Sequence, residues 1–408
     1  MKKIYIAIII LLIIVAASIF YMKQVNDRRI REKRALALEI KSHYNDYIST
    51  NKDSNLYDDK NNIVGSVSKD TKLILDKFNE SGYFKIKNLD LYINYIYVDG
   101  IDSFVYDDRY KNYIPFNINI KTKNTTKFYD SENNLLYSIN KSYDFPVIIK
   151  DTDKYGIIFN DQLLYVESND VEEVYDNKNT DLKNKKNIRT ITYHFLYDPN
   201  ARGCNEGICL TLAKFEEQIK YIRENDYFTL RLPELELYMD GKLQIPEKSI
   251  VLTIDDGTVI DPKALELLDQ YKVNMTLFLI TGWMPVDMFQ AEYLDIESHT
   301  NDMHTVNQCS GWGLQGGGIL CLPYDKVMDD LKQSQEALGG SVYFAYPFFD
   351  HNDRAIGILK DAGFHMAFVG SLGTDGISTP GVTDKFKMRR KTMFNDVSMN
   401  EFINEFLN

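Results

Sequence analysis

The chain has 408 residues, of which 44% are hydrophobic and 26% charged, and a formal net charge of −12. Its length exceeds what one hydrophobic core usually organises, so we expect more than one domain. The acidic balance disfavours a nucleic-acid partner, because phosphate binding requires clustered Lys and Arg. It also disfavours an acidic polymer as ligand, and a neutral sugar fits the charge better.

The N-terminus carries an uncharged apolar run from Ile4 to Met22, preceded by Lys2 and Lys3. With a helical rise of about 1.5 Å per residue the run would be roughly 28 Å long, enough to cross the hydrocarbon core of a membrane. We predict an uncleaved transmembrane anchor over residues 1–22. A cleaved signal peptide is the alternative, but the run is long and no small-x-small cleavage site follows it.

The residue composition changes twice in the middle of the chain. Residues 23–85 are charged or polar and are predicted to form a helical stalk followed by an irregular segment. Residues 86–175 contain short runs rich in Ile, Val and Tyr between Asp, Asn and Gly turns, which predict a small all-β domain. Residues 119–172 resemble a bacterial Src-homology-3-like barrel, a module often found on wall enzymes, and a β spacer without a ligand is the alternative. We expect no internal repeat.

The C-terminal half alternates between strand and helix patterns. The almost wholly polar residues 176–187 are predicted to be a linker. In the following 188–408, strands are predicted at 191–195, 249–254 and 275–280, and helices after the capping residue Thr211 and at 264–271. Repeated β–α units of this kind indicate a parallel sheet or barrel.

Four cysteines lie in this half, at Cys204, Cys209, Cys309 and Cys321. In an oxidising compartment the plausible pairs are 204–209 and 309–321, and free thiols are the alternative. A structural zinc site is disfavoured because the two-residue spacing of zinc ribbons is missing.

Two carboxylates end the predicted strand that begins at Ser249. Asp255 and Asp256 are followed by Gly257. Because successive side chains on a strand point to opposite sides, the two carboxylates can take different roles. The carboxyl end of a barrel strand is where catalytic groups lie. A structural turn is the alternative, since Asp-Asp-Gly commonly ends strands.

Two histidines follow some 40 residues later, His299 and His304, although the chain has only 6. Neutral imidazoles are frequent ligands of zinc. On a regular helix this spacing would place them about 140° apart, so we expect a loop or a local bulge there. Two unrelated surface histidines are the alternative.

These patterns together resemble a known family. Thr-Ile-Asp-Asp-Gly at 253–257, Ser-His-Thr at 298–300 with the second histidine, Phe-Ala-Tyr-Pro-Phe at 344–348 and the stretch 353–368 follow in order. They look like the successive motifs of the polysaccharide deacetylase family (NodB-homology domain, carbohydrate esterase family 4), closest to the poly-N-acetylglucosamine and peptidoglycan deacetylases. The resemblance covers 188–408. It implies an α/β fold, a distorted (β/α) barrel, preceded here by the small all-β domain and the N-terminal transmembrane helix.

The resemblance also implies roles for single residues. Asp256, His299 and His304 would bind a divalent metal in an open site, with Zn2+ preferred and Co2+, Ni2+ or Mn2+ as alternatives. Asp255 would be the general base. The backbone N–H of Phe348 would stabilise the oxyanion.

The chain departs from the family pattern at the general acid. No Leu-x-His follows residue 370, and His365 lies in a context that predicts a structural role. His194, at the end of the first strand of the domain, occupies a position that serves as general acid in poly-N-acetylglucosamine deacetylases. A strand-end histidine without a catalytic role is the alternative.

Two further departures concern the third motif. The family arginine is missing there, since Ser341-Val342 occupies the stretch, and Arg390 could reach Asp255 instead. Phe349 replaces the usual glycine, which leaves the shape of that loop open.

The resemblance predicts a metal-dependent enzyme that removes N-acetyl groups from N-acetylhexosamines of a cell-wall polysaccharide, with peptidoglycan preferred. Poly-N-acetylglucosamine, an exopolysaccharide, is the alternative substrate, and O-deacetylation is disfavoured because an ester would not require His194. An inactive wall-binding scaffold is the alternative of another class. The expected location is the cell membrane, single-pass, with the catalytic domain extracellular, although the basic residues after Met22 favour the opposite orientation. The expected partners are the glycan and the membrane.

Overall fold

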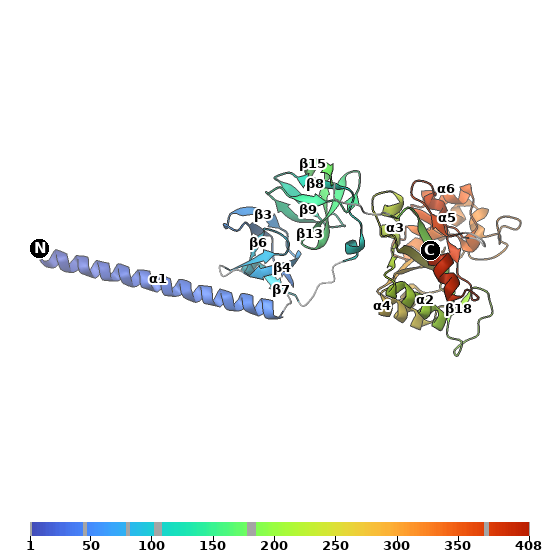
Figure 1. The fold of residues 1–408 in the computed structure, drawn as a ribbon, viewed down its shortest axis with the longest axis horizontal. Coiled ribbons are helices and arrows are strands. Elements are labelled where there is room, and N and C mark those ends of the chain that lie inside the picture. The colour runs from blue at the N-terminus through green and yellow to red at the C-terminus, as the bar shows by residue number, and fades with distance from the viewer. Residues whose placement is uncertain are drawn as a thin grey trace. The chain divides into compact units, whose positions relative to one another are not determined.

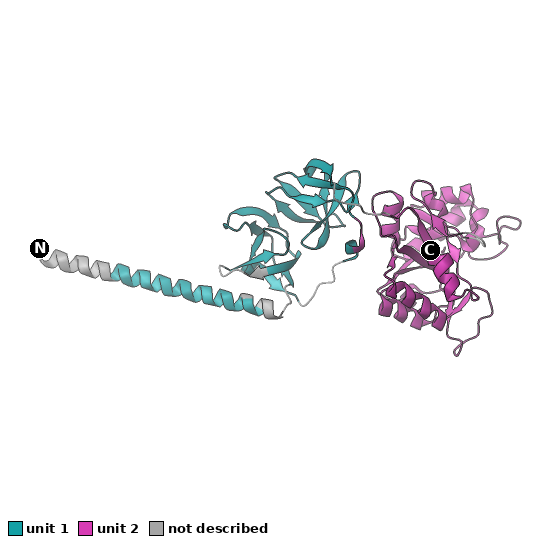
Figure 2. Ribbon diagram, viewed as in Figure 1, with its two compact units in different colours: residues 1–111, 115–181 teal, residues 112–114, 182–408 magenta. Residues whose placement is uncertain are grey.

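The computed structural model describes residues 2–43, 47–78, 82–101, 108–177, 185–370 and 375–407. The chain divides into two compact units, residues 1–111 with 115–181 and residues 112–114 with 182–408 (Figure 2). Most of the linker predicted at 176–187 lies outside the described residues.

The N-terminal segment forms one long helix, α1 (Lys2–His43), visible in Figure 1. Residues 23–43 of the predicted stalk are therefore helical. No helix in the described part of the chain is both long enough and apolar enough to cross a membrane. The side chains of residues 2–13, which hold much of the apolar run, lie outside the description. The predicted membrane anchor is not confirmed.

The prediction of an irregular segment up to residue 85 is wrong beyond residue 46. The first β region is formed by β1 (Tyr47–Thr50), β2 (Ser54–Tyr57), β3 (Ile63–Val67), β4 (Lys72–Phe78), β5 (Tyr83–Ile86), β6 (Tyr92–Asn94) and β7 (Val98–Gly100). Several of these strands bury a single large apolar side chain, such as Leu56 in β2, and are otherwise polar. So short an apolar pattern does not distinguish a strand from a loop.

The second β region lies within the predicted small β domain. It is formed by β8 (Ile118–Thr122), β9 (Thr126–Tyr129), β10 (Leu135–Ile139), β11 (Asp144–Pro146), β12 (Ile149–Lys150), β13 (Lys154–Phe159), β14 (Gln162–Glu167) and β15 (Val171–Asp176). The strand pairs described in this unit are antiparallel. The pair β3–β10 joins the first region and five strands of the second into one twelve-stranded sheet, and β8, β11 and β15 form a separate three-stranded sheet. A single buried cluster serves both regions, with Phe84 from one and Phe128 and Phe159 from the other.

The two β regions repeat one another, so the expectation of no internal repeat is wrong. Tyr57-Asp58 recurs as Tyr129-Asp130, and Asn61-Asn62 recurs as Asn133-Asn134. In both copies the aspartate Oδ1 accepts two backbone N–H groups of the same turn, at 2.9 and 2.8 Å. The first asparagine of each pair has φ 64°. The two copies have these turn residues in common but few identical apolar residues. The repeat is therefore inconspicuous in the sequence.

The second unit is built on parallel strands. The order along the sheet is β24 (Met366–Phe368), β23 (Tyr343–Ala345), β22 (Leu294–Ser298), β21 (Met275–Leu279), β20 (Ser249–Asp256) and β16 (Ile188–Tyr193). Met388 bridges Phe368 in parallel, and the short β26 (Lys391–Thr392) pairs with β16. The segment 388–392 thus brings the two ends of the sheet together into an incomplete barrel. The predicted α/β class is confirmed for this unit.

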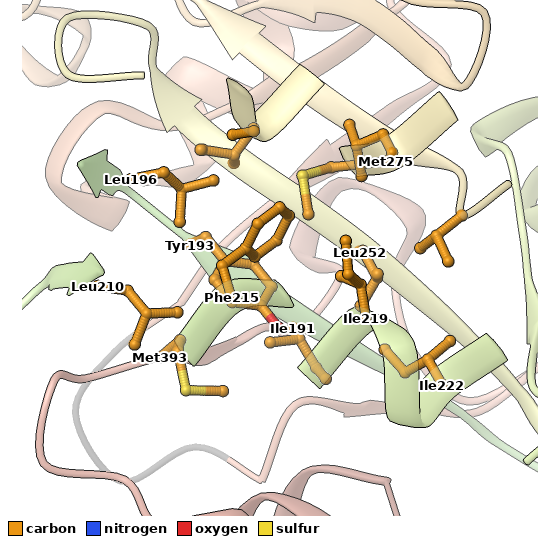
Figure 3. Packing of buried hydrophobic residues seen from close by; sticks show 14 of the residues in the cluster. Ile191, Tyr193, Leu196, Leu210, Phe215, Ile219, Ile222, Leu252, Met275 and Met393 are labelled. Atoms are coloured by element: carbon orange, nitrogen blue, oxygen red, sulfur yellow. The ribbon is translucent and has the colours of Figure 1, made fainter. Parts of the chain in front are cut away.

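Helices cover the barrel strands. They are α2 (Leu212–Glu224), α3 (Leu232–Met239), α4 (Pro262–Tyr271), α5 (Tyr324–Ala337), α6 (Asp353–Asp361) and α7 (Met399–Glu401). Thr211 caps α2, as predicted, by accepting the Lys214 N–H at 3.4 Å. Figure 3 shows Phe215 and Ile219 of α2 packed with Tyr193 and Leu252 of the strands beneath. All eight residues of β20 are buried, which is typical of a central parallel strand.

Candidate active site

The polar residues singled out in the sequence lie at the carboxyl ends of neighbouring strands. Asp255 and Asp256 end β20, His194 follows β16, and His299 follows β22. Because these strands are parallel, their carboxyl ends share one rim of the barrel, which is where parallel β/α folds place catalytic groups. The fold therefore brings residues that are a hundred positions apart to one place.

Asp256, His299 and His304 converge on one point. Their candidate ligand atoms all lie within 4.8 Å of one another. Oδ1 of Asp256 is 3.4 Å from Nε2 of His299 and 3.2 Å from Nε2 of His304. The segment from 299 to 304 is a loop rather than a helix, and Thr300 has a φ of 77° that turns the chain sharply. The prediction of a loop at this five-residue spacing is confirmed.

The protonation of these groups suits a metal ligand set. Nδ1 of His299 donates to the carbonyl oxygen of Ala345 at 2.8 Å, which orients the ring so that its Nε2 faces Asp256. Burial and the neighbouring His299 lower the pKa of His304 to about 4. Burial opposes the charge on Asp256, but the histidines around it hold the pKa of its carboxyl well below the usual value. The site thus offers one carboxylate and the ring nitrogens of two histidines as ligand atoms.

The environment of one carboxylate oxygen of Asp256 indicates that Asp256, His299 and His304 fit a cation. Oδ1 of Asp256 is buried, and no donor in the described part of the chain forms a well-aligned hydrogen bond with it. A buried carboxylate oxygen without a partner is costly unless something positive satisfies it. One carboxylate with two imidazoles is a common zinc ligand set that leaves a coordination position open. The three residues could therefore hold a divalent metal such as Zn2+.

The second carboxylate, Asp255, is paired with Arg390. Nη1 of Arg390 donates to Oδ1 at 2.6 Å and Nη2 donates to Oδ2 at 2.8 Å, with both side chains almost fully buried. Burial raises the pKa of Asp255, but Arg390 together with His299 and His194 outweighs this, and the net pKa of Asp255 is lowered. The carboxylate is therefore charged and held in one orientation. The structure places Arg390 where the sequence analysis expected it.

The packing of the Phe349 ring accounts for the phenylalanine that replaces the usual glycine in the third motif. Its ring centroid lies 5.4 Å from the Arg390 guanidinium, which the Phe278 ring faces at 5.5 Å. Phe348 and Phe349 both have positive φ, 57° and 62°, a strained conformation for residues with side chains. Gly370 makes room for the ring, since a Cβ there would lie 2.8 Å from it. No pattern in the sequence indicates that Phe349 packs against the buried charge pair.

His194 lies beside Asp255. Its Nε2 is 3.9 Å from Oδ2 of Asp255, and its Nδ1 is buried without a hydrogen-bond partner among the described residues. Burial lowers the pKa of His194 and outweighs the opposing charge of Asp255, so the imidazole is neutral at rest. An imidazole next to a carboxylate can exchange a proton with it during a reaction.

A cavity of about 700 Å³ opens above these groups. It is lined by His194, Phe195, Glu206, Ile208, Asp255, Asp256, His299, His304, Leu314, Gln315, Phe348 and Phe349. The ring of Phe348 packs against that of His304, with centroids 4.2 Å apart. The turn around Phe348 is closed by the amides of Phe349 and Asp350, which donate to Tyr346 and Pro347 at 2.9 and 3.0 Å. Phe348, the residue expected to supply the oxyanion donor, thus lines the cavity.

One cavity wall is a loop that the sequence analysis did not assign. Asp350 is 2% exposed and accepts the backbone N–H groups of Leu314, Gln315 and Gly317, the last two at 3.1 and 2.9 Å. The disulfide Cys309–Cys321 closes the same loop. The second disulfide joins Cys204 to Cys209, around Glu206 and Ile208 of the cavity. Both predicted cysteine pairs are confirmed.

Fold and site define an α/β barrel with a candidate metal site and a buried carboxylate at the carboxyl ends of its strands. Residues 242–367 match the family model described as polysaccharide deacetylase. The resemblance inferred from the motifs is confirmed, and the second unit is similar to the polysaccharide deacetylase family over residues 242–367.

Individual relatives agree with the family. The chain is 25% identical over 197 residues to a protein of Staphylococcus aureus (strain MRSA252) named poly-beta-1,6-N-acetyl-D-glucosamine N-deacetylase, covering 43% of this chain and 66% of the relative. A Staphylococcus epidermidis protein of the same name is 25% identical over 181 residues, covering 39% and 60%. The chain thus matches less than two thirds of the length of these relatives. A solved de-N-acetylase from Aggregatibacter actinomycetemcomitans aligns with 53% of this chain and 99% of its own, at 18% identity and a TM-score of 0.45.

Proposed function

We propose that the second unit hydrolyses N-acetyl groups of a hexosamine polymer, using a divalent metal held by Asp256, His299 and His304. The observation that carries the proposal is the convergence of this ligand set with Asp255 and His194 on one cavity. A scaffold without activity would not need the complete set. When bound, a metal such as Zn2+ would polarise the acetyl carbonyl and make a water molecule in the site more acidic.

In this proposal Asp255 is the general base. One of its carboxylate oxygens takes a proton from the water molecule that attacks the acetyl carbon. Arg390 keeps Asp255 ionised and aimed into the cavity through its two hydrogen bonds. The Phe348 N–H donates to the oxygen that becomes negative, an interaction worth about 3–4 kcal/mol in comparable sites.

His194 completes the reaction as the general acid. An amide nitrogen leaves poorly as an anion and needs a proton before the C–N bond breaks. His194 is neutral at rest, and its Nε2 lies 3.9 Å from Oδ2 of Asp255, so the proton taken from water passes between them through one bridging water molecule. His194 then protonates the nitrogen, so that acetate and a free amine are released. Such acid–base assistance typically contributes about 10²–10⁴-fold.

The proposed substrate is a β-linked N-acetylglucosamine polymer. The two staphylococcal relatives are named for poly-beta-1,6-N-acetyl-D-glucosamine, which favours an exopolysaccharide over the peptidoglycan preferred from the sequence. An extracellular location forms part of the proposal, since two disulfides suit an oxidising compartment. Anchoring through the N-terminal helix stays a prediction.

The test uses the full chain, loaded with Zn2+, and three acetylated polymers. Poly-β-1,6-N-acetylglucosamine, peptidoglycan and an O-acetylated xylan are incubated with it, and released acetate is measured. We expect release from the first. Release from peptidoglycan alone would move the proposal to the wall polymer, and no release from any of the three would favour an inactive scaffold.

The His194→Gln variant tests the assignment of the general acid. We expect its rate on the amide to fall by about 10²–10⁴-fold, while its rate on an O-acetyl ester falls much less, because an alkoxide leaves more easily than an amide anion. His365→Gln is the matched control, since the His365 side chain is half exposed and contacts Glu236 and Tyr343 rather than the candidate site. Equal losses on amide and ester would contradict the role of His194.

A further inference from the structure

The two β regions of the first unit form a symmetric pair, defined here as lobe 1 (residues 47–100) and lobe 2 (residues 118–176). Equivalent strands β3 and β10 pair antiparallel, with Ser66 opposite its own counterpart Ser138. On either side, Val67 pairs with Tyr137 and Gly65 with Ile139. This reciprocal register is that of a local two-fold axis. Equivalent positions of the two lobes can therefore be compared directly.

Lobe 2 carries a cleft of about 610 Å³, a size typical of ligand sites. It is lined by Tyr129, Asn133, Asp153, Lys154, Tyr165, Glu167, Ser168 and Asn169. Tyr129 and Tyr165 are direct cross-strand partners on β9 and β14, and both are half buried. Two neighbouring aromatic side chains thus lie among carboxylate, amide and hydroxyl groups.

The same place in lobe 1 is filled. Tyr57, the counterpart of Tyr129, packs edge-on against Tyr83, with ring centroids 5.1 Å apart. Tyr83 is the first residue of β5, whereas the corresponding strand β13 begins with Lys154. Nζ of Lys154 lies against the Tyr165 ring, 4.5 Å from its centroid, and donates to Asn133 at 3.2 Å. The two lobes thus differ at this place, with a tyrosine ring in lobe 1 and a lysine ammonium group in lobe 2.

The chemistry of the cleft matches an amino sugar. Tyrosine rings pack against the C–H faces of a sugar ring, and the surrounding amide, hydroxyl and carboxylate groups can bind its hydroxyls. Two carboxylates, Asp153 and Glu167, line the cleft with one cation, Lys154, so its lining carries a net negative charge. Burial and the carboxylates of Glu167 and Asp170 raise the pKa of the Tyr129 phenol. An ammonium group would therefore find carboxylates within the cleft.

We propose that the lobe 2 cleft binds de-N-acetylated hexosamine units, so that the chain holds its glycan at a second site through the glucosamine it produces. The identity of this glycan rests on the function proposed above. The bare presence of an amino-sugar site in lobe 2 does not, because it is argued from the residues of that lobe alone.

The test measures binding of a soluble β-1,6-glucosamine oligomer to the full chain by calorimetry. The Tyr165→Ala variant should weaken binding about tenfold, since truncation of a central aromatic contact costs about that much. Tyr92→Ala is the matched control, because Tyr92 pairs with Tyr57 in lobe 1 as Tyr165 pairs with Tyr129 in lobe 2, and it should leave the affinity unchanged. The N-acetylated oligomer should bind lobe 2 more weakly, because it has no ammonium group for the carboxylates.

Several outcomes would overturn the proposal. These are an affinity for the glucosamine oligomer that Tyr165→Ala does not change, equal losses in both variants, or binding of a wall peptide through Tyr165 in place of the sugar. Acetate release from a short N-acetylated oligomer is measured in parallel and should be the same in wild type and Tyr165→Ala. Glucosamine binding through Tyr165 without any acetate release would contradict the proposed enzymatic function and support the proposed glucosamine site. Acetate release with glucosamine binding that is independent of Tyr165 would sink the cleft alone.

Discussion

The Asp255→Asn variant should lose turnover while it keeps its metal. Asn cannot accept a proton from water, and loss of a general base typically lowers a rate by about 10²–10⁴-fold. The metal should stay because Asp256, His299 and His304 are unchanged. The measurement is kcat from acetate release, together with the metal content of the same sample. Asp287→Asn, at an exposed position, is the matched control and should behave as wild type.

Loss of folding must be separated from loss of chemistry in this variant, because Asp255 also pairs with Arg390. The unfolding midpoint of Asp255→Asn gives the fraction folded at the assay temperature. We expect the loss of kcat to exceed the loss of folded protein by orders of magnitude. A folded, metal-loaded Asp255→Asn variant with wild-type turnover would remove the assigned base.

The Arg390→Met variant should be destabilised by about 3–5 kcal/mol, because it leaves the Asp255 carboxylate buried without its partner. Methionine keeps much of the volume between Phe278 and Phe349, so loss of packing contributes little. Denaturant unfolding of the full chain measures the effect. Arg389→Met is the control, since this neighbouring side chain is 56% exposed. Equal stability of the two variants would contradict the importance of the buried pair.

The pH dependence of Arg390→Met has a definite sign. In the wild type the pKa of Asp255 is lowered, so its contribution to stability is present at neutral pH and is lost as the pH falls through that pKa. In the variant, burial without a partner raises the pKa of Asp255 above its unfolded value of about 3.9. The folded variant then binds a proton more readily than the unfolded chain, and the stability difference from wild type shrinks as the pH falls.

The residues around the candidate metal site could be predicted because they lie within short sequence motifs. Asp255 and Asp256 directly follow a buried strand, and the parallel arrangement predicted for that strand places such residues at one rim. Arg390 was found by a different route, since Asp255 needed a buried cation and the arginine expected before the third motif was missing. Its position follows from the segment that closes the barrel between Phe368 and β16.

Other parts of the site depend on contacts that no local pattern records. Asp350 holds the loop at 314–317 through three backbone N–H groups, and Phe349 covers Arg390 only because two successive residues adopt positive φ. Neither feature follows from periodicity or spacing. The strands between 47 and 86 were missed for a related reason. Their few apolar residues are buried in a core that both lobes share, and the sequence of one lobe does not show that core.

The central claim is that Asp256, His299 and His304 bind one divalent metal ion, and metal stoichiometry tests it most directly. The full chain is stripped with a chelator, reloaded with Zn2+, dialysed and analysed for metal per chain by mass spectrometry. We expect one ion per wild-type chain, and near-complete loss in His304→Ala, with His351→Ala, an exposed histidine outside the ligand set, retaining the ion. A folded wild-type chain without bound metal after reloading, or a His304→Ala variant that keeps it as tightly as wild type, would contradict the account.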